Sequence, residues 1–518
     1  MLEYKKFKAQ KFLCFQFDLS SLSKNVLIAN RGEIAIRIAR TCKKLDLKPF
    51  GIYSDADKNS LHIKYCEKAV DIGGFTPSES YLNMNKIIEA ASALGCELIH
   101  PGYGFLSENA DFAMLCNKEG LTFIGPSYES MSITGDKARS RKVASRITSI
   151  VDGDEVSNEV MAMDLAEEIG FPVILKAVQG GGGRGLRIIR SVEELKEAFA
   201  DSKNEAMISF GSDRIYIEKY IENPRHIEVQ VLADDSKIIH LGERECSVQR
   251  RHQKLIEETP SPVLTVDMRN SITKTAIAII KEMKYTNAGT VEFLFKDNKF
   301  YFMEVNARIQ VEHPITEAVT GVDIVEQQLR IALGDGLLIK QEDVRSKGHA
   351  IECRINSEHP LSFVPSPGTI TKFIMPDIEG VRIDTAIYSG YSIPSFYDSL
   401  IAKIISFANT RLEAIEKMKR SLMLFRITGI PSTIPFHISA LNDARFISGN
   451  YDTSFIDELR SFSSKDGEIA AALISLLPKK IKFLNKDVQE MAADPWAISR
   501  FDTIDLFNSN HNMNKWLR

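Results

Sequence analysis

The chain has little cysteine and no paired-cysteine motif. Seven cysteines occur in 518 residues, and no two are spaced as CxxC. This pattern predicts a reducing compartment and excludes a disulfide framework or a cysteine zinc site. The sequence also has no apolar run near the ~20 residues that a membrane-spanning helix needs. Its net charge of −4 gives no basic excess for binding nucleic acid. We therefore expect a cytoplasmic protein that binds neither a membrane nor nucleic acid.

Strand-like and helix-like segments alternate from Asn25 onward. The segments with strand patterns are 25–30, 48–54, 68–73 and 96–102, and those with helical spacing are 32–45, 81–94 and 107–120. Strands separated by helices predict a parallel, doubly wound α/β sheet. The turn after the first strand is Asn30-Arg31-Gly32 rather than GxGxxG. A dinucleotide site is therefore not supported, despite the Rossmann-like order of elements.

Changes of pattern divide the chain into five predicted units. These are an N-terminal extension (1–24), the alternating unit (25–137), a small unit with a glycine cluster (138–218), a strand-rich unit (219–455) and a C-terminal extension (456–518). The last unit contains both tryptophans, Trp496 and Trp516. We expect it either to dock a partner subunit, since exposed Trp and Leu are frequent interface anchors, or to wrap its own core.

Residues 290–312 predict a β-hairpin with one polar face. We expect a three-residue loop at 297–299 and a second strand whose polar side chains share a face: Glu304, Asn306, Arg308, Gln310 and Glu312. That loop places Glu292 opposite Glu304, with Cβ atoms roughly 5 Å apart. Two such carboxylates repel unless a cation lies between them, and Mg²⁺ with nucleotide phosphate is the candidate. The alternative is a solvated face with paired surface charges.

A glycine cluster, GGGGRG at 180–185, joins two strand-like segments and is not followed by a helix. This context excludes a Walker loop. Consecutive glycines can point several backbone N–H groups at one anion, and they can close as a lid over phosphates. A flexible hairpin tip is the alternative. Lys176, which ends the preceding apolar strand, favours a nucleotide.

Two further segments contain candidate site residues. In the basic stretch 244–254, strand spacing places Arg250, His252 and Lys254 on one face. Without interleaved aromatic residues, it fits an anion site better than a nucleic-acid site, and a surface basic patch is the alternative. Segment 100–112 places Tyr103 at the carboxyl end of a predicted strand, where ligands bind in open α/β sheets. A structural turn explains it equally well, and an ion pair with Glu352 is the alternative for Arg354.

The sequence resembles the biotin carboxylases, the ATP-grasp components of biotin-dependent carboxylases. The motifs that carry the resemblance follow in family order: IANRGEIAIRI, HPGYGFLSENADFA, KAVQGGGGRGL, EKYIENPRHIEVQVLAD, ECSVQRRHQKLIEETPSP, EVNARIQVEHPITE, GHAIECRIN and YDSLIAKI. They cover roughly residues 25–450. The resemblance implies an ATP-grasp fold with an N-terminal Rossmann-like parallel-sheet domain, a small lid domain and a strand-rich C-terminal domain.

The resemblance also implies a role for each matching residue. The implied ATP-binding residues are Lys137, Lys176, Gly181, Gly182, Gly183, Glu218, Lys219, Ile221, His226, Gln249 and His252. The implied metal ligands are Glu292, Glu304 and Asn306, and the implied bicarbonate pocket is Lys254, Arg308, Gln310 and Val311. Tyr103 and Arg354 are the implied biotin contacts, and the implied catalytic residues are Glu312 as general base with Arg308, Lys254 and Arg354.

The implied reaction is the carboxylation of biotin with MgATP and bicarbonate through carboxyphosphate, with a pair of Mg²⁺ or Mn²⁺ ions. The sequence contains no biotin-carrier pattern, since MKR at 418–420 lies in a predicted helix. It also contains no recognisable carboxyltransferase region. We therefore expect biotin to arrive as a substrate on a separate biotin carboxyl carrier protein. We also expect, by resemblance, a homodimer that works with a separate carboxyltransferase subunit.

Several interpretations of the whole protein remain open. The chain is expected to serve an acyl-CoA carboxylase for acetyl-CoA or propionyl-CoA, and a two-subunit pyruvate carboxylase is the alternative. A different ATP-grasp ligase, joining a carboxylate to an amine, would share the glycine lid and the metal glutamates. It would have no reason to carry RIQVEHP together with HQK. A non-catalytic assembly subunit would have no reason to keep Lys254, Glu312 and Arg354.

Overall fold

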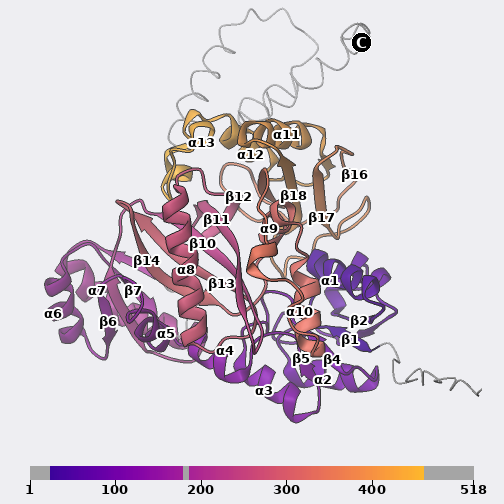
Figure 1. Cartoon of the computed structure of the whole chain (residues 1–518), viewed down its shortest axis with the longest axis horizontal. Coiled ribbons are helices and arrows are strands. Elements are labelled where there is room, and N and C mark those ends of the chain that lie inside the picture. The colour runs from indigo at the N-terminus through magenta and orange to yellow at the C-terminus, as the bar shows by residue number, and fades with distance from the viewer. Residues whose placement is uncertain (1–23, 179–185, 460–518) are drawn as a thin grey trace, which may run out of the picture.

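The computed structural model describes residues 24–178 and 186–459 (Figure 1). The predicted glycine lid, with Gly181, Gly182 and Gly183, lies outside the described residues. The same holds for nearly all of both predicted extensions, including Trp496 and Trp516. Within the described ranges, no helix has the length and apolar character needed to cross a membrane.

A five-stranded parallel sheet forms the N-terminal unit, in the spatial order β3-β2-β1-β4-β5. Its strands are β1 (Asn25–Ile28), β2 (Lys48–Tyr53), β3 (Lys68–Asp71), β4 (Leu98–His100) and β5 (Thr122–Phe123). The connecting and following helices are α1 (Gly32–Lys44), α2 (Met84–Ala93), α3 (Ala110–Lys118), α4 (Tyr128–Gly135) and α5 (Lys137–Ala144). Every strand and helix predicted for residues 25–120 is present, and the predicted parallel pairing is confirmed.

A small antiparallel sheet follows, in the order β6-β9-β7-β8. It consists of β6 (Gly153–Val156), β7 (Val173–Ala177), β8 (Leu186–Ile189) and β9 (Ile215–Lys219), with helices α6 (Glu159–Ile169) and α7 (Val192–Phe210). Its own apolar cluster includes Leu175, Leu195 and Ile217. Figure 1 shows this unit projecting at one end of the molecule, so that it contacts the rest through few elements.

An eight-stranded antiparallel sheet forms the centre, in the order β14-β13-β10-β11-β12-β15-β18-β17. Its strands are β10 (Arg225–Ala233), β11 (Ile238–Arg250), β12 (Gln253–Thr259), β13 (Asn287–Lys296), β14 (Lys299–Asn306), β15 (His349–Asn356), β17 (Val381–Thr385) and β18 (Leu400–Ala408). A two-stranded sheet, β16 (Lys372–Ile374) with β19 (Arg426–Thr428), lies apart from it. The surrounding helices are α8 (Val266–Glu282), α9 (His313–Thr320), α10 (Ile324–Leu333), α11 (Arg411–Leu424), α12 (Ile434–Asn442) and α13 (Ala444–Ser448).

The β13–β14 hairpin has the predicted pairing but not the predicted turn. Its loop has two residues, Asp297 and Asn298, both with positive φ, which is the geometry of a two-residue hairpin turn. The register then shifts by one residue at a bulge, and this shift brings Glu292 opposite Glu304. The three-residue loop was therefore wrong, whereas the Glu292–Glu304 pairing is confirmed, because the bulge supplies the residue that the loop lacks.

Two expectations of continuous strand are also wrong. Strand β14 ends at Asn306, and residues 307–312 form an irregular segment that leads into α9. Arg250, His252 and Lys254 do not share one strand face, because Arg251 and His252 form a tight turn with positive φ between β11 and β12. Lys254 instead pairs with Gln249 across that hairpin.

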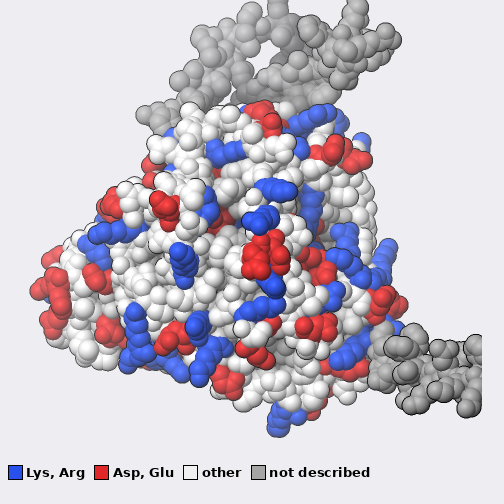
Figure 2. All heavy atoms as spheres, in the orientation of Figure 1, with Lys and Arg blue, Asp and Glu red and all other residues white. Residues whose placement is uncertain are grey.

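Surface charge is mixed in sign. Figure 2 shows lysine and arginine side chains interspersed with aspartate and glutamate over the visible face. The cysteines that the structure describes are all free, and five of them are buried. These features agree with an ordinary globular surface and with structural, unpaired thiols.

A buried ion pair within the first unit contacts a tyrosine from the later part of the chain. Arg31, just after β1, donates from Nε and Nη2 to Asp57 at 2.6 Å each, and Asp57 has no exposed surface. The Arg31 guanidinium also lies 4.3 Å from the centroid of the Tyr397 ring. Tyr397 in turn donates to Ser54 at 2.7 Å. These contacts fix the first sheet against the segment before β18.

We predict that Asp57→Ala destabilises the protein by ~3–5 kcal/mol, because it leaves a buried guanidinium without its carboxylate. Calorimetry should show a clearly lower Tm. The matched control is Glu67→Ala, which removes the partner of Lys43 from a pair 3.7 Å apart whose side chains are about half exposed. Exposed pairs contribute little, so the control Tm should stay close to that of the parent. Equal effects of the two substitutions would contradict this account.

Candidate active site

Four charged side chains form one row across the central sheet. Glu304 lies opposite Glu292, Glu292 opposite Glu228, and Glu228 opposite Arg244. Glu228 and Arg244 have no exposed surface, and Glu292 is 4% exposed. Arg244 donates to Glu228, to Gln230 at 2.7 Å and to Thr316 at 3.0 Å. The antiparallel register therefore aligns three carboxylates on one face, with a guanidinium at the end of the row.

Lys254 neutralises the centre of this row. Its Nζ donates to Glu228, to Glu292 Oε1 at 2.8 Å and to Glu312 Oε1 at 2.7 Å. Burial alone would lower the pKa of Lys254, but the three carboxylates raise it well above its usual range. The ammonium therefore stays charged at any physiological pH.

Glu312 lies between two cations. Besides Lys254, it accepts a hydrogen bond from Arg354 Nη2 at 2.8 Å, and the Arg354 Nε donates to Glu257 at 2.6 Å. Burial alone would raise the pKa of Glu312, but Lys254, Arg354 and Arg244 hold it well below the usual range. Glu312 is therefore ionised and able to accept a proton. Among the described residues, the Arg354–Glu352 ion pair considered as an alternative does not form, because Arg354 turns toward Glu257 and Glu312.

The irregular segment 307–312 is held by a residue from the first unit. Glu108 accepts from the Ala307 backbone N–H at 3.0 Å and from Arg308 Nε at 2.8 Å. Arg308 also donates to Gln310 Oε1 at 2.8 Å and to Asn306 Oδ1 at 3.2 Å. Gln310 then donates to Glu292 at 3.3 Å. The polar side chains that were predicted to share one strand face therefore still contact one another, although residues 307–312 form an irregular segment.

The oxygen atoms of Glu292, Glu304 and Asn306 fit a divalent cation. Glu304 makes no hydrogen bond or ion pair among the described residues, and it lies opposite Glu292. Burial raises the pKa of Glu304, while the nearby Lys137 opposes that rise. Carboxylate and amide oxygens suit Mg²⁺ or Mn²⁺. A cation between the two strands would remove the repulsion and ionise Glu304.

Residues assigned to ATP lie around the small sheet and its junction with the centre. Lys176 on β7 pairs with Glu218 on β9, and Arg141 holds the same carboxylate at 2.9 Å. Burial alone would raise the pKa of Glu218, but Lys176 and Arg141 lower it. Lys137, at the start of α5, forms no ion pair within the described residues, and burial lowers its pKa. A bound triphosphate would supply an anionic partner for the Lys137 ammonium.

Other predicted ATP residues are more dispersed. His226 lies on β10 with its Nε2 at 3.2 Å from Glu292, and Glu292 raises its pKa against the effect of burial. Lys219 donates to the backbone carbonyls of Gly170 and Phe171 at 3.0 and 2.8 Å. Ile221 follows β9, Gln249 lies on β11, and the exposed His252 lies in the adjoining turn. The structure thus links His226 directly to the carboxylate row but not Lys219.

Tyr103 reaches the site through a buried pair. Its hydroxyl donates to Glu33, and Glu33 forms an ion pair with Lys403 Nζ at 3.0 Å. Lys403 also donates to the Val311 carbonyl at 2.9 Å and lies 5.8 Å from the centroid of the Tyr103 ring. Gly102 has a φ of +64°, which glycine adopts without strain, and it permits the turn that presents Tyr103.

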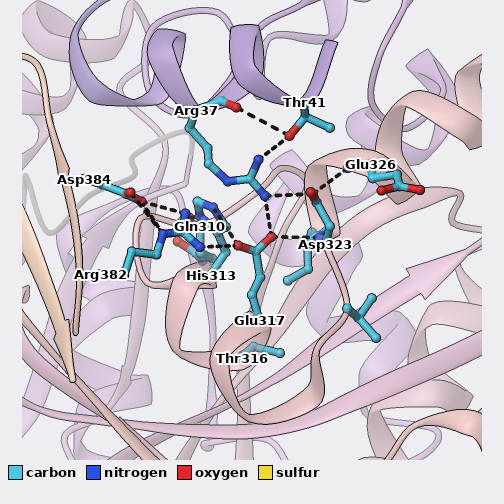
Figure 3. Close-up of polar contacts among 12 residues, drawn as sticks. Arg37, Thr41, Gln310, His313, Thr316, Glu317, Asp323, Glu326, Arg382 and Asp384 are labelled. Carbon is cyan, nitrogen blue, oxygen red and sulfur yellow. Dashed lines mark hydrogen bonds and ion pairs between the residues drawn. The ribbon is translucent and has the colours of Figure 1, made fainter. Parts of the chain in front are cut away.

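A second charged cluster borders the segment before α9. Glu317 on α9 lies between Arg37 and Arg382, at 2.8 and 2.7 Å (Figure 3). His313 Nδ1 lies 2.7 Å from the Gln310 carbonyl oxygen, so the cluster touches the predicted bicarbonate segment. Its members belong to α1, α9 and β17, which it ties together.

Sequence reasoning missed several residues of this network. Four residues were not singled out, although each contacts a predicted site residue: Glu228, Glu108, Glu33 and Lys403. For Glu228 a signal existed, because it alternates with His226 and Gln230 on one strand face. For Glu108 and Lys403 the chain gives no local signal, since their partners are distant in sequence.

Comparisons with known proteins identify related families along most of the chain. Residues 22–131 match the "Biotin carboxylase, N-terminal domain", 136–340 the "Carbamoyl-phosphate synthase L chain, ATP binding domain", and 352–458 the "Biotin carboxylase C-terminal domain". "Biotin carboxylase 1" of Bacillus subtilis is 50% identical over 441 residues, covering 84% of this chain and 98% of its own. A pyruvate carboxylase subunit from Methanothermobacter thermautotrophicus is 48% identical, over 84% of this chain and 90% of its own.

Solved structures show the same fold. A biotin carboxylase from Campylobacter jejuni, described as an ATP complex, superimposes with a TM-score of 0.82 at 46% identity, over 84% of this chain and 98% of its own. The biotin carboxylase domain dimer of Hydrogenobacter thermophilus 2-oxoglutarate carboxylase, with MgADP and bicarbonate, also gives 0.82 at 46% identity, over 84% and 97%. The predicted α/β ATP-grasp fold is confirmed.

We predict that Glu304→Gln weakens Mn²⁺ binding by roughly 10-fold or more, because losing even an outer partner of a metal costs ~10–100-fold. Binding can be followed by the electron paramagnetic resonance of free Mn²⁺ in the presence of ADP. Glu282→Gln makes the same charge change on an exposed helix position paired with Arg146, and it should leave the affinity near that of the parent. Equal loss in both variants would count against the metal assignment.

Proposed function

Because the chain belongs to the biotin carboxylase family of ATP-dependent ligases, we propose that it carboxylates biotin on a separate carrier protein for an acyl-CoA carboxylase. ATP-dependent carboxylation of biotin is the activity common to this family. The finer assignments are the carrier, the acceptor and the roles of single residues. The observation that carries the proposed residue roles is the contact of Glu312 with both Lys254 and Arg354. That arrangement supports Glu312 as a base between Lys254, which would contact bicarbonate, and Arg354, which would contact biotin.

Glu312 is the proposed base that takes the proton from bicarbonate. Lys254, Arg308 and Gln310 would hold the anion beside it, with the planar guanidinium matching planar bicarbonate. In the free protein, Lys254 and Arg354 make Glu312 a weak base. When Lys254 turns toward bicarbonate and Arg354 toward biotin, that restraint relaxes and the basicity of Glu312 rises. Substrate binding would thus activate the base.

The nucleotide would be held by Lys137, Lys176 and the residues at β9. We expect the glycine cluster at 180–185, which lies outside the described residues, to contribute to phosphate binding. A divalent cation at Glu292, Glu304 and Asn306 would neutralise phosphate charge when bound. The bicarbonate oxygen attacks the γ-phosphate to give carboxyphosphate and ADP. Carboxyphosphate releases CO₂ and phosphate, and the phosphate takes the biotin N1′ proton. Arg354 then stabilises the biotin enolate as it captures CO₂, with Tyr103 beside the ring.

The proposed partners are a second copy of the chain, a biotin carboxyl carrier protein and a carboxyltransferase subunit. The proposed acceptor is acetyl-CoA or propionyl-CoA. A two-subunit pyruvate carboxylase is the second candidate, supported by a relative that is named as part of a pyruvate carboxylase. We also propose the division into units at 25–137, 138–218 and 219–455, with 456–518 as a partner-docking extension. Another ATP-grasp ligase is not favoured by the relatives found.

The proposal predicts that free biotin raises bicarbonate-dependent ATP hydrolysis by the purified chain with MgCl₂. Glu312→Gln should abolish the increase, because an amide of the same shape cannot accept the proton. Rates can be followed by coupled ADP release. The control Glu326→Gln changes a charge on α10 that pairs with Lys44 near the surface, and it should keep the increase. If the rate of ATP hydrolysis depends on neither biotin nor bicarbonate, the result would favour an ATP-grasp ligase that joins a carboxylate to an amine.

We further predict that Glu108→Gln raises the KM for bicarbonate roughly 10-fold, since hydrogen bonds to charged groups contribute ~1.5–3 kcal/mol. The KM for ATP should change little, because Glu108 orients Arg308 rather than the lysines near the phosphates. The control is Glu119→Gln, an exposed position at the end of α3. A rise in the ATP KM alone would place Glu108 outside the bicarbonate pocket.

A further inference from the structure

Two buried carboxyl groups lie side by side behind Arg354. Glu257 on β12 pairs directly with Glu352 on β15. Neither residue has exposed surface. Side chains directly opposite on neighbouring antiparallel strands have Cβ atoms ~4.5–5.5 Å apart. The sheet therefore forces two acidic groups together away from water.

These two carboxyl groups have too few partners to be ionised together. Glu257 Oε1 accepts from Arg354 Nε at 2.6 Å, and its Oε2 has no hydrogen-bond partner among the described residues. Neither oxygen of Glu352 has a partner within the same part of the chain. An ionised carboxylate buried without hydrogen bonds is strongly unfavourable, and one of two adjacent carboxyls normally takes up a proton.

The cations around the pair are already engaged. Arg354, also on β15, donates to Glu257 and Glu312. Lys403 on β18 is 3.0 Å from Glu33 of α1 and 3.9 Å from Asp384 of β17, and it donates to the Val311 carbonyl. The other charged or titratable groups near the pair are Glu312 before α9, Lys254 on β12, Tyr103 with Glu33, and the buried thiols Cys246 on β11 and Cys353 on β15. Adding another full negative charge would leave it without a cation of its own.

The direction of the pKa shifts agrees with the geometry. Burial, with Glu257 and Glu312 nearby, raises the pKa of Glu352 well above its usual range. Burial and Glu312 likewise raise the pKa of Glu257, to about 7, although Arg354 opposes the rise. The neighbouring Glu258 behaves in the opposite way. Burial alone would raise its pKa, but hydrogen bonds from His349 and Arg411 lower it to about 2.

We propose that Glu257 and Glu352 hold one proton between them, with Glu352 neutral, and that they act as positioning residues for Arg354. The singly charged pair anchors the Nε side of the guanidinium through Glu257. It leaves Nη1, which donates no hydrogen bond to the described residues, to meet the ligand. A neutral Glu352 also keeps negative charge away from the place where the biotin enolate forms. The positioning role rests on the proposed function, whereas the bound proton does not.

The bound proton is tested by the pH dependence of thermal stability, using the full chain. A carboxyl whose pKa is raised on folding binds more protons in the folded state, so its contribution falls as the pH rises above ~4.5. Glu352→Gln keeps the shape without the titration. We expect its Tm, relative to the parent, to increase by ~1–2 °C between pH 6 and pH 9.

Glu258→Gln is the matched control, since it alters the next residue after Glu257 on the same strand. Its parent carboxyl has a lowered pKa, so its stabilisation is fully present above ~pH 4.5 and does not change between pH 6 and pH 9. The Tm of this variant should be lower than that of the parent, by the same amount at pH 6 and at pH 9. If the Tm of Glu352→Gln relative to the parent stays constant or falls between pH 6 and pH 9, the proposal of a bound proton is wrong.

The positioning role is tested by biotin-dependent ATP hydrolysis at pH 7 and pH 9. An ionised Glu352 opposes an enolate that forms only after biotin has bound, so the effect falls on kcat rather than on KM. We expect the kcat of Glu352→Gln relative to the parent to rise ~3-fold from pH 7 to pH 9, with an unchanged ratio of biotin KM values. A ratio of kcat values independent of pH would overturn the role while leaving the proton result intact. Absence of any biotin stimulation in the parent would instead refute the proposed function.

Discussion

The ammonium group of Lys254 is the interaction on which the rest of the site depends. It touches three buried carboxylates, Glu228, Glu292 and Glu312, from β10, β13 and the residue before α9. Charges a few Å apart interact strongly in a buried setting, and an unbalanced carboxylate there costs several kcal/mol. Without this cation, the carboxylates of the row would be destabilised by burial or would have to take up protons. Lys254 therefore allows the acidic side chains of β10 and β13 to lie close together. It also supplies the positive charge at the centre of the site.

Strand register places the charges, and bent segments adjust them. The bulge between Glu292 and Phe293 brings Glu304 onto the same row as Glu292 and Glu228. Beyond β14 the chain leaves the sheet, so Arg308, Gln310 and Glu312 reach the site from an irregular segment held by Glu108. Rigid strands thus fix the carboxylates proposed to bind the metal and also Lys254, whereas Arg308, Gln310 and Val311 of the proposed bicarbonate pocket lie on a segment with its own hydrogen bonds. Sites on rigid elements are the more exactly positioned.

Much of the fold was predictable from the sequence, because alternation and helical spacing are local signals. The parallel first sheet, the two strands around the glycine cluster and the Glu292–Glu304 pairing followed from them. The turn lengths did not, since a two-residue loop with a bulge and a three-residue loop give the same pairing. The partners Glu108 and Lys403 were missed because they contact residues 200 and 92 positions away. No periodicity within one segment reports such contacts. The roles of individual site residues came from family resemblance and await the experiments above.

Glu108 has a consequence for how this protein can be divided or recombined. It belongs to the loop before α3, yet it holds the backbone and side chain of the segment after β14. The first sheet is therefore no detachable accessory, although it has its own strands and helices. A chimera that replaced residues 25–137 with an unrelated Rossmann-like module would keep Lys176 and the residues at β9, but it would lose Lys137 and the clamp on Arg308. A recombined protein would therefore keep the site only if residues 25–137 and the later units came from the same parent. This limits the domain recombination that such a multi-unit architecture would otherwise permit.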